Sequence, residues 1–224
     1  MKTDVFEIQG LKCVIGYPTS YEKGHKYPVI IFLHGAGSRG EDIEILKNNP
    51  YFKIISQHKN FSFISVAPQC SKNTWFDQFE ALKRMTEEIT TYDFADSARI
   101  YLMGASMGGY AVWQLAMSMP EIFAAIVPIC GGGMYWNAAR LTNIPIWAFH
   151  GALDKTVLVE ESVKMVDEVN RKKGHAKLTV YPNNSHDAWS DTYANFEVFQ
   201  WLLTHTNKKE TPLNDAYKGS AIYG

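Results

Sequence analysis

The chain has 224 residues, a length that suits a single α/β domain, and a formal net charge of −1. Hydrophobic residues make up 46% and charged residues 20%, which excludes collagen-like, low-complexity and intrinsically disordered classes. The balanced charge, with no basic stripe, argues against nucleic acid as a partner.

Apolar segments rich in β-branched and aromatic residues recur along the chain. The first segment, Val5 to Tyr17, predicts one or two antiparallel edge strands. The later segments are apolar throughout rather than alternating, which indicates strands buried on both faces, as in a parallel sheet. These predicted strands are Val29 to Leu33, Phe61 to Ala67, Ile100 to Met103, Ala124 to Ile129, Ile146 to Phe149 and Leu178 to Tyr181.

Segments with helical periodicity lie between the predicted strands. Apolar residues recur every three or four positions over 79–92, 159–169 and 193–203. Alternation of strands and helices predicts a doubly wound, mostly parallel sheet flanked by helices. We expect a single domain over residues 1–206, followed by a loosely held polar tail over residues 207–224.

Three connections are longer than the usual two to six residues. They are His34 to Asn60, Cys70 to Phe76 and Gly131 to Pro145. Each follows the carboxyl end of a predicted parallel strand, and open α/β sheets bind their ligands at this edge.

The segment Gly104-Ala105-Ser106-Met107-Gly108 lies between a predicted strand and a predicted helix. This is a G-x-S-x-G pattern in the context that a nucleophile elbow requires. A serine held in a strained turn leaves no room for side chains at the two flanking positions, so glycine occupies them. The following helix directs its unpaired N–H groups toward the same place, where they would stabilise an oxyanion.

A serine hydroxyl needs a base and a group that orients the base. Asp154 follows the predicted strand Ile146 to Phe149, and His186 follows the predicted strand Leu178 to Tyr181. Three separate loops would therefore bring Ser106, Asp154 and His186 to one edge of the sheet, in the order typical of such a triad.

A second loop of small residues, His34 to Gly40, follows the Val29 strand. Such a loop lets a backbone N–H approach a substrate oxygen closely. We assign the oxyanion hole to the N–H groups of Ala36 and Met107, with Gly37 as the competitor for the first position.

At this point the chain resembles the α/β-hydrolase superfamily over about residues 25 to 205, and within it the compact, lidless serine esterases. That group includes feruloyl and acetyl esterases, polyhydroxybutyrate-depolymerase-like proteins and proteins called predicted peptidases. The resemblance rests on four segments: Leu33-His34-Gly35-Ala36-Gly37, Ala67-Pro68-Gln69-Cys70 with Trp75, Gly104 to Gly109, and His150-Gly151 with Asp154. It implies a serine carboxylesterase that acts through an acyl-serine intermediate. The segment from Gly131 to Pro145 is too short for a large cap domain.

The resemblance also implies small esters of carbohydrates or aromatic acids, such as acetyl or feruloyl esters, as the expected substrates. Trp75, Trp136 and Trp189 lie in or beside loops at the catalytic edge and are candidate substrate contacts, although each could equally cap the core. His34 and His150 compete with His186, but both precede glycine at a strand end and suit buried structural histidines. Histidines with metal-ligand spacing are absent from the sequence, so we expect neither a metal nor another cofactor.

Two alternative functions stay open at this stage. The same triad could hydrolyse a peptide, another amide or a thioester. A non-catalytic pseudo-hydrolase that serves as a binding module is the second alternative, because one fold can carry many functions. The oligomeric state is left open.

The chain contains three widely spaced cysteines, Cys13, Cys70 and Cys130. Their number and spacing favour a reducing compartment. Asp4 and Glu7 interrupt the region where a signal peptide would be apolar, and the sequence contains no run of about 20 apolar residues. We therefore expect a cytoplasmic protein without a membrane partner.

Overall fold

The computed structural model describes residues 1–207, so the predicted tail lies outside the described residues except for Asn207. Eight strands form one sheet, in the order β1-β2-β4-β3-β5-β6-β7-β8. The strands are β1 (Lys2–Ile8), β2 (Leu11–Tyr17), β3 (Tyr27–Leu33), β4 (Ile64–Pro68), β5 (Ala95–Ala105), β6 (Ala125–Ile129), β7 (Ile146–Gly151) and β8 (Ala176–Tyr181).

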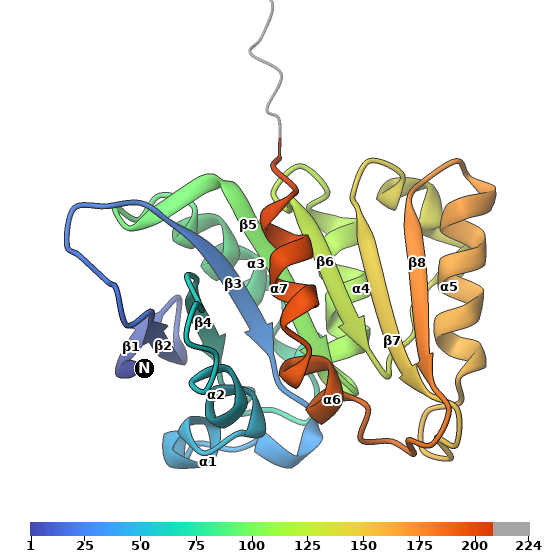
Figure 1. Cartoon of the computed structure of the whole chain (residues 1–224), viewed down its shortest axis with the longest axis horizontal. Coiled ribbons are helices and arrows are strands. Elements are labelled where there is room, and N and C mark those ends of the chain that lie inside the picture. The colour runs from blue at the N-terminus through green and yellow to red at the C-terminus, as the bar shows by residue number, and fades with distance from the viewer. Residues whose placement is uncertain (208–224) are drawn as a thin grey trace, which may run out of the picture.

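The strand pairing confirms the predicted sheet. β1 pairs with β2, and β2 with β4, in antiparallel fashion at one end of the sheet. All other neighbouring pairs, from β4 through β8, are parallel. Because β3 to β8 run in one direction, the loops that follow them leave the same edge of the sheet (Figure 1).

Helices cover both faces of the sheet, as Figure 1 shows. The α-helices are α1 (Ile43–Lys47), α2 (Pro50–Ile55), α3 (Phe79–Ile89), α4 (Met107–Ser118), α5 (Glu160–Arg171), α6 (Trp189–Ala194) and α7 (Phe196–Leu203). Residues 1–207 also form three short 3₁₀ helices: η1 (Ala36–Ser38), η2 (Trp75–Gln78) and η3 (Tyr135–Leu141). Buried side chains of α3, α4 and α5 share one hydrophobic cluster, and those of α1, α2, α6 and α7 share another.

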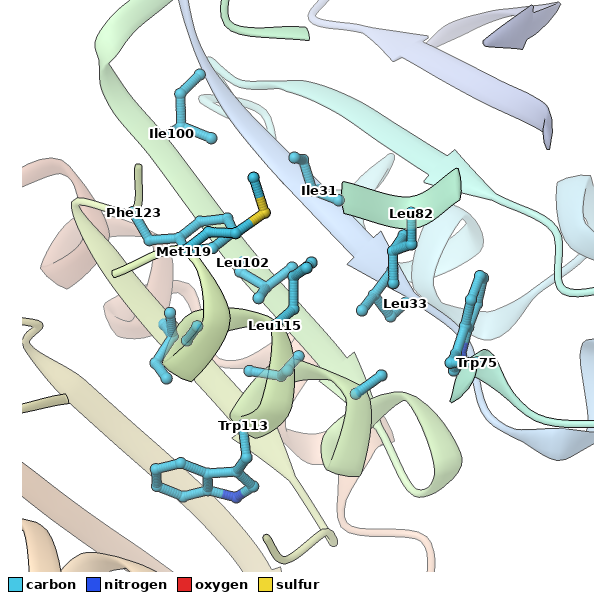
Figure 2. Close-up of a cluster of buried hydrophobic side chains, with 14 of the residues drawn as sticks. Ile31, Leu33, Trp75, Leu82, Ile100, Leu102, Trp113, Leu115, Met119 and Phe123 are labelled. Atoms are coloured by element: carbon cyan, nitrogen blue, oxygen red, sulfur yellow. The ribbon is translucent and has the colours of Figure 1, made fainter. Parts of the chain in front are cut away.

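The first hydrophobic cluster lies between the sheet and α3, α4 and α5. Figure 2 shows Leu33 and Leu102 from the strands facing Leu115 of α4, with Trp75 and Trp113 at the margins of the cluster. Both tryptophans are completely buried. This core fixes the position of α4, the helix that directly follows Ser106.

The structure differs from the sequence-based prediction in several places. The strand predicted from Phe61 begins only at Ile64, because Phe61 closes a turn on the carbonyl of His58 while its ring packs in the core. The helix predicted over 193–203 is broken at Asn195, whose side chain caps α7 through the N–H of Glu197. The long connection after β3 contains α1 and α2, which were not predicted.

The connection after β6 carries only η3, in agreement with the prediction that a large cap domain is absent. Among the helices of residues 1–207, none combines the length and the apolar character that a membrane crossing requires.

Candidate active site

Ser106 lies between β5 and α4, at the carboxyl edge of the sheet. Its backbone has φ 56° and ψ −118°, a conformation that a residue with a side chain rarely adopts. The N–H of Ser106 donates to the carbonyl of Ile129 at 2.9 Å and so ties the turn to the end of β6. Surrounding structure must hold such a strained residue, and this combination is typical of functional sites.

The glycines that flank the strained serine sit where side chains cannot fit. A Cβ on Gly104 would lie 2.7 Å from the carbonyl oxygens of Gly108 and Leu33. A Cβ on Gly108 would overlap the carbonyl of Leu33 in β3. Because the obstructing atoms belong to the backbone, rotation of a side chain cannot relieve the contact, so α4 can approach β3 only through glycine.

The structure brings Ser106, His186 and Asp154 together in one chain of hydrogen bonds. Ser106 Oγ lies 2.8 Å from His186 Nε2, and His186 Nδ1 lies 2.7 Å from Asp154 Oδ2. A carboxylate accepts, so His186 carries its proton on Nδ1 and Nε2 is free to accept from the serine hydroxyl. This arrangement can remove a proton from Ser106.

Asp154 is oriented by backbone groups as well as by His186. Its Oδ1 accepts from the N–H of Thr156 at 2.8 Å and from the N–H of Val157 at 3.0 Å. Burial alone would raise the pKa of the Asp154 carboxyl, but the hydrogen bonds from His186, Val157 and Thr156 outweigh burial and lower this pKa. Asp154 therefore stays ionised at neutral pH. Its negative charge would stabilise an imidazolium at His186.

The loop after β3 lies against the serine. A Cβ on Gly35 would stand 3.5 Å from the Cβ of Ser106. His34 is buried below this loop, where its Nδ1–H donates to the carbonyl of Gly35 at 2.7 Å and its Nε2 accepts from the N–H of Cys70 at 2.9 Å. In a trans peptide the carbonyl and the N–H point in opposite directions, so this bond also orients the N–H of Ala36. The first N–H of α4, from Met107, has no partner within the helix.

We expect His34 to make the protein less stable in mild acid. Burial lowers the pKa of His34 from 6.5 to about 4. Between these values the unfolded chain binds a proton that the folded chain does not, so the free energy of unfolding falls as the pH decreases from 6.5 to 4. The free energy of unfolding should therefore be roughly 3 kcal/mol lower at pH 4 than at pH 7.5. Urea unfolding at a series of pH values, for the wild type and His34→Gln, measures it.

The variant should be less stable than the wild type at neutral pH but should lose less stability on acidification. Equal slopes of stability against pH in the two proteins would contradict a neutral, buried His34.

A pocket of about 500 Å³ opens beside Ser106. Its volume lies in the range of small-molecule sites, which are mostly apolar with a few polar groups. The polar groups at this pocket include Ser106 and His186, and the loop Gly35 to Ser38 forms one side. The remaining walls are largely apolar and include Phe32, Pro50, Ala105, Trp189 and Tyr193.

The three tryptophans proposed as substrate contacts have different surroundings. The expectation for Trp75 is wrong: its side chain is completely buried, and its Nε1–H donates to the carbonyl of His34 at 3.0 Å. Trp136 is 67% exposed on η3 and does not line the pocket that contains Ser106. Trp189 does line this pocket. Its ring centroid lies 5.1 Å from that of His186, and the two rings form a T-shaped arrangement.

The sequence reasoning missed several groups at the site. Pro50 and Tyr193 line the pocket, yet neither residue belongs to a recognisable catalytic motif. Asn49-Pro50 does contain a local signal, because an asparagine cap followed by proline is typical of a helix start, and Asn49 indeed caps α2. The N–H groups of Thr156 and Val157 act through the backbone, which side-chain patterns do not reveal.

Cys130, His150 and Asp154 are close enough to each other to be considered as metal ligands. One ligand atom from each lies within 4.8 Å of the others, and all three residues are buried. Burial raises the pKa of the Cys130 thiol to about 12, although a metal ligand must be the thiolate. Asp154 is already bound to His186, and His150 Nε2 lies 2.9 Å from the carbonyl of Val157. The group therefore fits a hydrogen-bonded support for the site better than a metal centre.

Known proteins resemble this chain in sequence and in fold. The model of the phospholipase/carboxylesterase family matches residues 19–202. A crystal structure described as that of a thermostable esterase superposes with a TM-score of 0.71 at 28% identity, over 92% of this chain and 63% of that chain.

Two curated proteins show weaker similarity. Dipeptidyl-peptidase 5 of Porphyromonas gingivalis is 20% identical over 220 residues, which covers 75% of this chain and 32% of that protein. A bifunctional acetylxylan esterase/xylanase of Neocallimastix patriciarum is 21% identical over 131 residues, which covers 57% of this chain and 19% of that protein. The chain thus spans about a third or less of the length of these relatives.

Proposed function

The chain belongs to the phospholipase/carboxylesterase family of α/β-hydrolases, and on that basis we propose that it is a serine hydrolase of carboxylic esters. The observation that carries the proposal is the hydrogen-bonded series Ser106–His186–Asp154, in which Ser106 and His186 line a largely apolar pocket. A buried carboxylate, an oriented imidazole and a strained serine are the parts that acyl transfer to a serine requires.

The proposed reaction has two halves. Ser106 Oγ attacks the acyl carbonyl carbon while its proton passes to His186 Nε2, and the ionised Asp154 stabilises the imidazolium. The N–H groups of Ala36 and Met107 donate to the oxyanion. His186 then protonates the oxygen of the leaving alcohol, so that an acyl-serine remains. A water molecule then attacks the acyl carbonyl carbon while it gives a proton to the same histidine. The histidine returns this proton to Ser106 Oγ as the acyl–oxygen bond breaks and the acid leaves.

For the substrate we propose small esters of aromatic acids or carbohydrates. The apolar pocket with Trp189 beside His186 suits an aromatic or short acyl group. The similarity to a bifunctional acetylxylan esterase/xylanase supports a carbohydrate as the alcohol.

Trp189→Ala is expected to impair hydrolysis of methyl ferulate more than hydrolysis of p-nitrophenyl acetate. The ferulate alone would lose an aromatic contact of about 0.5 to 1.5 kcal/mol, which predicts a rise in its KM of about two- to thirteenfold. Steady-state kinetics on the two esters measure the difference.

Trp136→Ala is the matched control, because this exposed tryptophan does not line the pocket. Its kinetics should equal those of the wild type on both esters. If Trp189→Ala affected the two esters equally, or if Trp136→Ala reproduced its effect, the proposed aromatic subsite would be refuted.

Hydrolysis of an amide is the second candidate activity, and the similarity to dipeptidyl-peptidase 5 favours it. Compounds with the same acyl group, as ester, thioester and anilide, separate the possibilities. The proposal predicts the highest kcat/KM on the oxygen ester, and activity on every compound should disappear in Ser106→Ala. A higher kcat/KM on the anilide than on the oxygen ester would identify the protein as an amidase rather than an esterase. Complete inactivity, together with failure of a fluorophosphonate probe to label Ser106, would favour a binding module.

A further inference from the structure

A second histidine contacts the carboxylate that orients His186. His150 Nε2 lies 3.3 Å from Asp154 Oδ2, and both side chains are completely buried. The same nitrogen lies 2.9 Å from the carbonyl oxygen of Val157. Both partners only accept hydrogen bonds, so Nε2 must carry a proton and must donate it between them.

Ser162 of α5 holds the other side of the His150 ring. His150 Nδ1 lies 2.8 Å from Ser162 Oγ, which lies 2.9 Å from the carbonyl oxygen of Gly131. Ser162 has one proton to give either to Gly131 or to Nδ1, which makes His150 a cation in the first case and a neutral ring in the second. The Nε2–H points toward Val157 and Asp154 in both cases, so Ser162 orients the ring independently of its charge.

Both the N–H and the carbonyl group of Val157 form hydrogen bonds. Its N–H donates to Asp154 Oδ1, and its carbonyl accepts from His150. His150 therefore acts on Asp154 in two ways: it holds the segment whose N–H groups fix Oδ1, and it contacts Oδ2 directly. The hydrogen bond from His186 to Oδ2, at 2.7 Å, is the shorter of the two histidine contacts.

We propose that His150 and Ser162 are positioning residues for the reaction: through Asp154 and Val157 they fix the carboxylate in the orientation that holds His186 against Ser106. This inference rests on the proposed function, because it assigns Asp154 its role there. The pair links α5 and the loop after β6 to the site without touching the substrate. Loss of the pair should reduce kcat and leave KM nearly unchanged, since a misaligned base slows the chemical step and does not change the pocket.

The test uses three variants of the full chain with p-nitrophenyl acetate. His150→Leu removes every polar contact of the ring and should lower kcat by about a hundredfold, with KM within twofold of the wild type. This lies well below the roughly 10⁴-fold cost of a wrong histidine tautomer. His150→Gln keeps an N–H donor near the position of Nε2. Its kcat should be at least tenfold higher than that of His150→Leu. Ser162→Ala should lower kcat by about tenfold.

Ser65→Ala is the matched control. Ser65 is also completely buried, and its Oγ lies 2.8 Å from Tyr51 Oη. It belongs to β4, four strands across the sheet from β7, the strand that Asp154 follows. This variant should lose stability comparable to that lost by Ser162→Ala, as measured by urea unfolding, while kcat stays within twofold. If Ser162→Ala and Ser65→Ala affected kcat equally, or if the loss in His150→Leu appeared only in KM, the positioning role would be refuted.

A spectroscopic readout separates this inference from the proposed function. The His186–Asp154 hydrogen bond should give a strongly downfield proton resonance in NMR spectra. We expect this resonance in the wild type and in Ser65→Ala, and we expect it to shift or broaden in Ser162→Ala and His150→Leu. An unchanged resonance in the folded Ser162→Ala would overturn the inference even if the enzyme were an esterase. A shifted resonance would support it even if esters were not the substrate. Should His150→Leu fail to fold, Ser162→Ala carries the same test.

Discussion

Ser106→Ala is expected to lower kcat on p-nitrophenyl esters by roughly 10⁶-fold, the size of effect that follows loss of the serine in an enzyme of this type. Without Oγ there is no nucleophile for His186 to activate, although the pocket and the oxyanion loop stay in place. The residual rate would come from transition-state stabilisation by these groups alone. Initial-rate measurements with highly purified protein, together with labelling by a fluorophosphonate probe, give the result.

Ser71→Ala serves as the control for this substitution. Ser71 is an exposed serine in the loop after β4, and its removal should leave kcat and labelling as in the wild type. Activity of Ser106→Ala within tenfold of the wild type would mean that another residue performs the reaction.

Gly108→Ala should have the largest effect on stability. A Cβ at this position would overlap the carbonyl of Leu33 and approach the carbonyl oxygen of His34 to 2.9 Å. Since these atoms belong to the backbone of β3 and its loop, α4 would have to move away from the sheet. We expect a loss of about 4 kcal/mol in the free energy of unfolding, which corresponds to a decrease of roughly 8 to 16 °C in Tm. Thermal and urea unfolding measure both quantities.

Gly37→Ala provides the comparison, because a Cβ there would have no neighbour within 4 Å. Its stability should stay within about 0.5 kcal/mol of the wild type. If Gly108→Ala were as stable as Gly37→Ala, the inference that the close approach of α4 to β3 excludes a side chain at position 108 would be wrong.

The sheet and the loops that carry the three residues of the triad were predictable, because the sequence patterns that indicate them are local. Continuous apolar strands indicate a parallel sheet, and the loops that follow such strands meet at one edge. Ser106, Asp154 and His186 could therefore be selected from three loops, and the structure places their side chains within hydrogen-bonding distance.

Features that depend on the surroundings of a side chain were not predictable. Trp75 follows a strand, as Trp189 does, but only the fold reveals that its indole turns inward to the carbonyl of His34. The break at Asn195 interrupts an apolar period that by itself favours one continuous helix. The contact of Ser162 with His150 joins a helix to a strand end, and neither residue type suggests it.

The most direct test of the central claim is to trap the acyl-enzyme. The protein is mixed with p-nitrophenyl butyrate, quenched in acid within the first turnovers, digested and analysed by mass spectrometry. The account predicts a butyryl group on the peptide that contains Ser106, and no adduct in Ser106→Ala. An enzyme that hydrolyses the ester while the quenched protein carries the acyl group on another residue would contradict a mechanism through Ser106.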